Sequence, residues 1–125
     1  MRNRMIAVVT ATVLAVMASG AARAGEADVV GVEVTKQGPE TYAFSVTLRH
    51  ADEGWEHYAD AWDVVAPDGT VLGKRTLYHP HVDEQPFTRS LSGVRIPAGI
   101  ETVTIRAHDS VHAYGGRERR VTLPR

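Results

Sequence analysis

The chain has 125 residues, with 14 basic and 15 acidic side chains, six histidines and no cysteine. Without the three arginines of the first 24 residues, 11 basic and 15 acidic side chains remain, a net charge of about −4. This acidic balance argues against a nucleic-acid-binding protein, which would carry a basic patch, and the lack of cysteine excludes disulfides and cysteine-linked lipid.

The first 24 residues are typical of an export signal. Arg2 and Arg4 precede an apolar run at 5–18, and the small-x-small sequence at 22–24 is a cleavage signal. The apolar run is shorter than the roughly 18 to 20 residues that a membrane-spanning helix needs. We therefore expect cleavage after Ala24 and one periplasmic or secreted domain over 25–125, with no transmembrane segment in the mature chain.

The mature sequence is divided into short runs of alternating apolar and polar residues, separated by turn residues such as "QGPE", "PDG" and "PAG". This pattern is typical of β-strands, and no window shows a sustained helical period. Seven such runs in about 100 residues predict a seven-stranded antiparallel β-sandwich of the immunoglobulin or fibronectin III kind. The expected strands cover residues 29–35, 42–50, 57–66, 70–79, 87–96, 101–109 and 118–123.

At the level of pattern, the mature chain resembles the immunoglobulin and fibronectin III sandwich class over nearly its whole length. The third run contains Trp62, which we expect to pack in the core. The chain is also similar to small exported bacterial sandwich families that lack an assigned activity. This resemblance is architectural and implies a fold, not a function.

The histidines are distributed unevenly. If successive strands run up and down, every second turn lies at the same end of the sandwich, and all six histidines fall at that end. The turns at the opposite end contain none. Imidazole nitrogens and carboxylate oxygens are ligands of zinc and copper(II), so the pattern indicates a metal site. The histidines concerned are His50, His57, His79, His81, His108 and His112.

Spacing ranks the candidate ligands. His79 and His81 are two residues apart, so in an extended segment they would point to the same side. His50 follows the buried parity of its strand, as do Asp60 and Asp109 in theirs, and a buried charge must be paired or bound. The predicted ligand set is His50, His79, His81, Asp109 and His112.

The remaining candidates are weaker. Asp60, together with His50 and Asp109, is as consistent with a structural hydrogen-bonded network that connects the second, third and sixth strands as with a ligand set. His57 and His108 have the opposite parity in their strands, and we expect them at the outer surface.

The sequence thus predicts an exported protein that binds zinc or copper(II). Copper(I), which prefers sulfur, fits badly because the mature chain has neither Met nor Cys. The alternative is a metal-independent module that binds a peptide, a glycan or an exported protein through Trp55, Tyr58 and Tyr114. A small metal-dependent enzyme is less favoured, because no residues with catalytic spacing and no nucleotide-binding motif occur.

Overall fold

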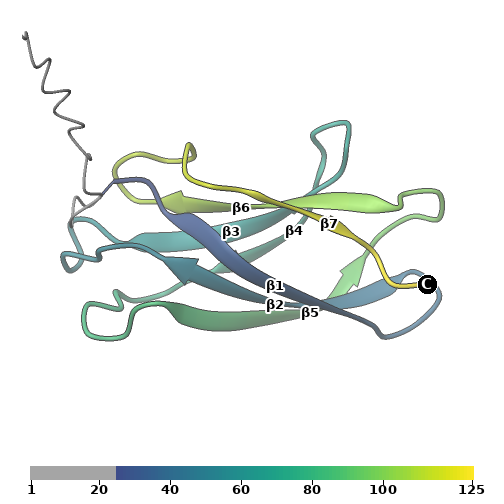
Figure 1. Ribbon diagram of the computed structural model, residues 1–125, viewed down its shortest axis with the longest axis horizontal. Helices are drawn as coiled ribbons and strands as arrows, with labels where there is room; N and C mark the ends of the chain where they lie inside the picture. Colours follow the sequence, from purple (N-terminus) through teal and green to yellow (C-terminus); the bar gives the residue numbers. More distant parts are fainter. Residues whose placement is uncertain (1–24) are drawn as a thin grey trace, which may run out of the picture.

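The computed structural model describes residues 25–125 (Figure 1). Seven β-strands account for the regular structure of this region, and no helix occurs in it. Each strand coincides with one of the runs expected from the sequence. The strands are β1 (Asp28–Lys36), β2 (Thr41–Arg49), β3 (Ala59–Val65), β4 (Val71–Thr76), β5 (Phe87–Arg95), β6 (Thr102–Asp109) and β7 (Arg119–Thr122).

The strands form two antiparallel sheets. One has the order β1-β2-β5 and the other the order β4-β3-β6-β7, and Figure 1 shows them as two layers. The prediction of an all-β fold with seven antiparallel strands is confirmed. The narrower assignment to the immunoglobulin or fibronectin III class stays a prediction, and the signal segment lies outside the described residues.

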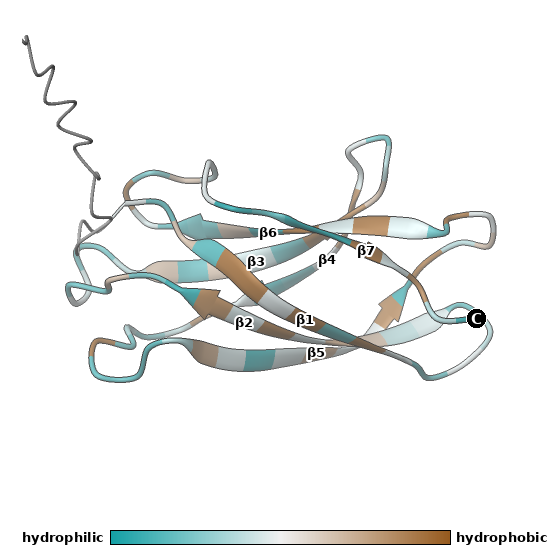
Figure 2. Cartoon of the chain, viewed as in Figure 1, coloured by the Kyte–Doolittle hydropathy of each residue, from teal (hydrophilic) through white to brown (hydrophobic). Residues whose placement is uncertain are grey.

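The core lies between the sheets. Alternate residues of β2, namely Tyr42, Phe44, Val46 and Leu48, are buried, while their neighbours are partly exposed or exposed. Trp62 of β3 is fully buried, as expected, and truncating a buried aromatic of this size to alanine typically costs about 3–5 kcal/mol. Figure 2 shows the brown apolar bands along the strands and the paler loops at their ends.

The strand directions bring four segments to one end of the molecule: the chain start at 25–27 and the loops at 50–58, 77–86 and 110–118. We call this end the histidine pole, because it contains all six histidines. The pairing of Asp28 with Arg49, and of Ala59 with Asp109, aligns the strand ends there. The clustering expected from the sequence is therefore confirmed.

One irregularity changes the direction of a predicted site residue. The pairing of β3 with β6 shifts register between Ala59 and Ala61, which is the signature of a β-bulge. Asp60 therefore does not share the core face with Trp62. It is half-buried and pairs with His108 on the outer side of the sheet. The expectation that Asp60 has the buried parity is wrong, because the extra residue of a bulge interrupts the alternation of side chains between the two faces of the sheet.

Within residues 25–125, no helix is long and apolar enough to cross a membrane.

A buried histidine and aspartate cluster as a candidate metal centre

Three buried side chains from different parts of the chain meet at the histidine pole: His50, His57 and Asp109. The Nε2 atoms of the two histidines are 3.2 Å apart. Oδ2 of Asp109 lies 3.2 Å from Nε2 of His50 and 3.3 Å from Nε2 of His57. These atoms form a nearly equilateral triangle, and this group, which we call the triad, could hold a metal ion.

The edges of the triangle match the distances between neighbouring ligand atoms around a bound metal ion. Zinc binds histidine nitrogen and carboxylate oxygen at about 2.0–2.1 Å, so two ligands of a tetrahedral ion lie roughly 3.3 Å apart. Two neighbouring ligands of a square-planar ion with the same bond length lie roughly 2.9 Å apart. The edges of the triad are 3.2, 3.2 and 3.3 Å, which is close to one face of a zinc-sized tetrahedron.

Asp52 fixes the orientation of His50. Its Oδ1 accepts a hydrogen bond of 2.5 Å from Nδ1 of His50, and both side chains are fully buried. The carboxylate also accepts the backbone N–H groups of Ala59 and His81. Because Nδ1 is engaged, Nε2 is the nitrogen that faces the triad. A carboxylate behind a metal-binding imidazole fixes the ring in this way in many metal sites.

The charges around His50 support this arrangement. Burial lowers the pKa of His50, but the hydrogen bond to Asp52 and the charges of Asp52 and Asp109 outweigh burial, so the pKa is raised. The pKa of Asp52 is lowered although burial opposes this, because His50 and the N–H groups of His81 and Ala59 donate to its carboxylate. The Asp52 and Asp109 carboxylates thus favour the protonated form of the His50 ring.

The two carboxylate oxygens of Asp109 have different partners: one accepts hydrogen bonds from a turn, and the other faces the triad histidines. Oδ1 accepts the N–H groups of Val111 and His112, while Oδ2 faces His50 and His57. Burial raises the pKa of Asp109, but the hydrogen bonds from His112, Val111 and His57 lower it overall. The carboxylate is therefore ionised and directed inward, as a metal ligand must be.

His57 occupies a different place from the one the sequence predicts. Strand β3 begins at Ala59, so His57 lies in the preceding loop, where the parity of the strand does not apply. Its backbone N–H donates to the Gly54 carbonyl and its own carbonyl accepts from Glu53. This turn places the ring in the triad with only 7% of the residue exposed. The expectation of a surface position is wrong, whereas its candidacy as a weaker ligand has geometric support.

Two further groups border the triad. Nδ1 of His112 lies 3.1 Å from Oδ2 of Asp109, with 37% of the His112 side chain exposed. The carbonyl oxygen of Gly25 lies 2.8 Å from Nε2 of His50. The His112 side chain is thus the most exposed of the histidine and aspartate side chains in and beside the triad, since those of His50 and Asp109 are fully buried.

His79 and His81 are not part of the triad. Nε2 of His81 is 2.9 Å from the Arg89 guanidinium, which donates to it, and the His81 ring stacks on Phe87. Burial and then the charge of Arg89 lower the pKa of His81. Exposed His79 lies beside His81, with ring centroids 4.7 Å apart. Two side chains connect His81 to His50: Asp52 accepts the His81 N–H and the His50 Nδ1 hydrogen, and Gln85 donates to the His81 carbonyl and accepts the His50 N–H.

A second polar group covers the outer face of the larger sheet. Nδ1 of His108 is 2.5 Å from Oδ1 of Asp60. Next to this pair, the Tyr114 hydroxyl donates to fully buried Asp63, and Arg106 also donates to Asp63 while lying over the Tyr114 ring. Within residues 25–125, His50, His57 and Asp109 are the set whose ligand atoms lie close enough to share an ion. In this second group the Asp63 carboxylate is engaged by Tyr114 and Arg106, which fixes the loop at 110–118 to the sheet.

The aromatic residues predicted for partner binding differ in exposure. Trp55 is 68% exposed and contacts half-buried Tyr58 edge to face. Tyr114 is half-buried and its hydroxyl is engaged by Asp63, so it is less available to a partner. The sequence reasoning missed Tyr78, which is 76% exposed. It also passed over Asp52 as a supporting carboxylate, although its spacing of two residues from His50 is visible in the sequence.

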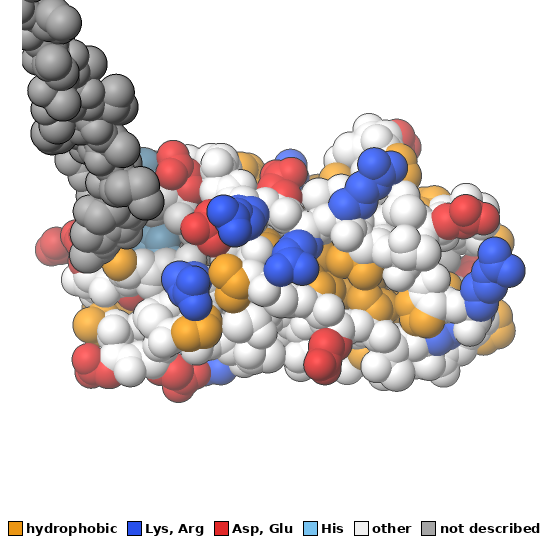
Figure 3. Space-filling view, viewed as in Figure 1, with side chains coloured by type: hydrophobic (Ala, Val, Ile, Leu, Met, Phe, Trp, Pro, Cys, Tyr) orange, Lys and Arg blue, Asp and Glu red, His pale blue; other side chains and the backbone are white. Residues whose placement is uncertain are grey.

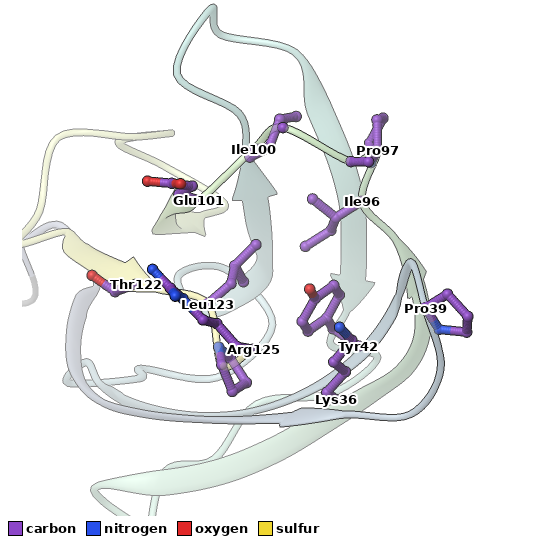
Figure 4. Close-up of a pocket in the computed structure, with 13 residues that line it drawn as sticks. Lys36, Pro39, Tyr42, Ile96, Pro97, Ile100, Glu101, Thr122, Leu123 and Arg125 are labelled. Atoms are coloured by element: carbon purple, nitrogen blue, oxygen red, sulfur yellow. The ribbon is translucent and has the colours of Figure 1, made fainter.

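Charged side chains are also distributed unevenly over the surface. In Figure 3, acidic side chains gather at the left end of the molecule, where histidine surface is visible. A hollow of about 320 Å³ lies at the opposite end, between Tyr42, Ile96 and Leu123 (Figure 4). Its lining contains none of the predicted ligands.

Comparison with known proteins gives one informative similarity. A protein of the archaeon Halomicrobium mukohataei, named "Putative lipoprotein", is 45% identical over 92 residues, which are 74% of this chain. The aligned region covers 45% of that relative, so the chain matches about half of its length. No protein-family model matches the chain. No solved structure matches it either.

Proposed function

We propose that this is an exported protein that binds one divalent metal ion, with zinc favoured, through His50, His57 and Asp109. The observation that carries the proposal is the triangle of ligand atoms with edges of 3.2–3.3 Å, buried at the histidine pole. Asp52 supports it, because it holds His50 in the orientation and tautomer that a metal ligand needs.

Ligand chemistry and size narrow the choice of metal. Two imidazoles and a carboxylate suit zinc and copper(II), and the triangle is nearer the tetrahedral spacing of zinc than the square-planar spacing of copper(II). Since the domain has no disulfide, a bound ion would also stabilise it, because an ion that binds the folded chain alone shifts the folding equilibrium.

Export is the second part of the proposal. The basic start, short apolar run and small-x-small sequence of residues 1–24 support a signal peptide that is cleaved after Ala24. The relative named as a lipoprotein supports a location outside the cytoplasm. We propose a periplasmic or secreted mature domain over 25–125, in which the ion is taken up past the exposed edge of His112.

The test is to purify the mature domain without an affinity tag and to measure bound metal by mass spectrometry and zinc affinity by calorimetry. We expect about one zinc ion per chain. His50→Ala, His57→Ala and Asp109→Asn should each lose most of the binding. His79→Ala, which changes an exposed ring outside the triad, is the matched control and should bind as the wild type does.

The outcomes separate clearly. Loss of binding in the triad variants alone, with an unchanged β-sheet circular dichroism spectrum, supports the assignment. A wild-type protein that binds neither zinc nor copper(II) contradicts the proposal. Equal loss in His79→Ala would also contradict it, because the ligands would then lie in the loop at 77–86.

A second candidate function rests on the exposed apolar side chains. Five large apolar residues of 25–125 are exposed, and four of them lie at the histidine pole. Contiguous exposed apolar surface marks interaction sites, and because these four side chains lie at one end, we propose this pole as the place where an exported protein, a peptide or a glycan would bind. The four residues are Trp55, Tyr78, Val82 and Val111.

A further inference from the structure

Gly25, the first residue that the structure describes, lies directly at the triad. The carbonyl oxygen of Gly25 is 2.8 Å from Nε2 of His50, the same nitrogen that faces His57 and Asp109. In Figure 1 the start of β1 lies at the same end as the end of β6. A main-chain oxygen therefore borders the triad at the nitrogen of His50 that faces it.

This position is held by several contacts. The N–H of Val29 donates to the Arg117 carbonyl, and the N–H of Arg117 donates to the Asp28 carboxylate. Ala27 is buried, and its carbonyl oxygen packs so closely on Gly116 that a Cβ at that position would lie 2.0 Å away. The segment at 25–28 is thus part of the packed structure at the histidine pole.

The hydrogen bond from His50 to Gly25 cannot persist once a metal binds. A ring nitrogen that coordinates an ion gives its lone pair to the metal and carries no hydrogen, so it cannot donate to the Gly25 carbonyl. The carbonyl oxygen would then face a nitrogen lone pair at 2.8 Å, unless it also coordinates the ion. A separation of 2.8 Å is close to the roughly 2.9 Å expected of two ligands at a right angle around one ion.

We propose that Gly25 is a metal ligand through both of its main-chain donors. Cleavage after Ala24 would leave Gly25 as the first residue, and its α-amino nitrogen and carbonyl oxygen can close a five-membered chelate ring with the ion. Together with the triad, this gives five ligands, so the triad would be one face of a five-coordinate site and not of a tetrahedron; zinc adopts both coordination numbers. The inference rests on the proposed function and adds that export processing completes the site.

The chemistry balances without a further reactant. An α-amino group has a pKa of about 7.7–8.0, so near neutral pH it gives up one proton when the ion binds. His50 gives up the proton that it otherwise donates to the Gly25 carbonyl. No bond in the chain is made or broken, other than the signal cleavage that exposes the amine.

The experiment compares two forms of the mature domain, one that starts at Gly25 and one with a single serine before Gly25. The extension keeps the carbonyl but moves the amine out of chelating position. Zinc affinity is measured by calorimetry, and copper(II) serves as a spectroscopic probe through the nitrogen splittings in its electron paramagnetic resonance spectrum. The metal-free melting temperature checks that the fold is unchanged.

We expect the serine-extended form to bind zinc at least about tenfold more weakly, because the chelate ring is lost. Its copper(II) spectrum should show one nitrogen fewer. Equal affinities and identical spectra would overturn the role of Gly25 while leaving the triad intact. Absence of binding in both forms would overturn the triad as well. Intact mass of the exported protein should correspond to a start at Gly25, and a different start would also overturn the inference.

Discussion

Asp52 lies behind His50 and directs it: Oδ1 of Asp52 accepts the Nδ1 hydrogen of His50 at 2.5 Å, so Nε2 of His50 faces His57 and Asp109. The same carboxylate accepts the N–H groups of Ala59 and His81. One buried side chain thus connects the start of β3, the loop at 77–86 and the triad. The contribution of Asp52 to zinc affinity can be measured separately from the contributions of the ligands.

Asp52→Asn should weaken zinc binding by about 10–100-fold, which is the usual effect of removing a carboxylate behind a metal-binding histidine. The amide keeps the size of the side chain but lacks the negative charge, and it replaces one acceptor oxygen by a donor that faces an N–H group. Calorimetric titration with zinc measures the change.

Asp60→Asn is the matched control, because Asp60 forms the same kind of pair with His108, also at 2.5 Å, on the outer face of the sheet. It should leave zinc affinity within about twofold of the wild type. If both variants lost affinity equally, the effect of Asp52 would be a general effect of charge and not one of orientation.

The strands and their common pole could be predicted from the sequence, because both depend on local rules. Alternation along 42–48 identifies β2, and the antiparallel order then places every second loop at one end. The buried positions of His50 and Asp109 could be predicted in this way. Each residue continues the buried parity of its strand, and each is buried in the triad.

The remainder of the site depends on geometry that alternation does not encode. His57 is brought inward by a turn before β3, and Asp60 is turned outward by a β-bulge. His79 and His81 have the spacing of a chelating pair, yet Arg89 occupies the His81 nitrogen. The contact of Gly25 with His50 joins residues 25 apart and leaves no sequence signature.

Gly116→Ala should destabilise the chain start. The added Cβ would lie 2.0 Å from the Ala27 carbonyl oxygen, so the backbone at 25–28 must move, at a cost of about 1–3 kcal/mol in the free energy of unfolding. Urea denaturation of the metal-free protein measures this cost.

Gly38→Ala is the control for Gly116→Ala. It lies in a turn at the opposite end, where the nearest atom to an added Cβ is 3.8 Å away. Its effect on the free energy of unfolding should stay within about 0.5 kcal/mol. Equal costs for the two substitutions would show that the segment at 25–28 does not pack tightly on Gly116.

Tyr114→Phe should cost about 1–3 kcal/mol in the free energy of unfolding. The Tyr114 hydroxyl donates to Oδ2 of fully buried Asp63, whose Oδ1 already has no hydrogen-bond partner. Tyr78→Phe, at a residue 76% exposed, is the control and should be nearly neutral. Thermal and urea unfolding compare the two variants, and a neutral Tyr114→Phe would show that Arg106 alone satisfies Asp63.

The contribution of His50 to the metal-free stability and the stabilisation by zinc should depend on pH with opposite signs. The pKa of His50 is raised in the folded state, so its contribution to the metal-free protein is complete below the unfolded value of about 6.5 and is lost as pH rises through the folded pKa. The pKa values of Asp52 and Asp109 are lowered, so their contribution is present above about 3.9 and is lost as pH falls through the folded values. Because the pKa of His81 is lowered, His81 contributes with the opposite sign over the same range. The metal-free melting temperature of the wild type relative to that of His50→Gln should therefore decrease from pH 6 towards pH 8.5. Zinc needs a deprotonated His50, so the increase in melting temperature caused by zinc should grow over the same range. Differential scanning calorimetry of both forms measures these slopes, with His50→Gln as the reference that lacks the His50 contribution and keeps that of His81. A difference in metal-free melting temperature between the wild type and His50→Gln that grows from pH 6 to pH 8.5 would contradict the ion pairing of His50 with Asp52 and Asp109.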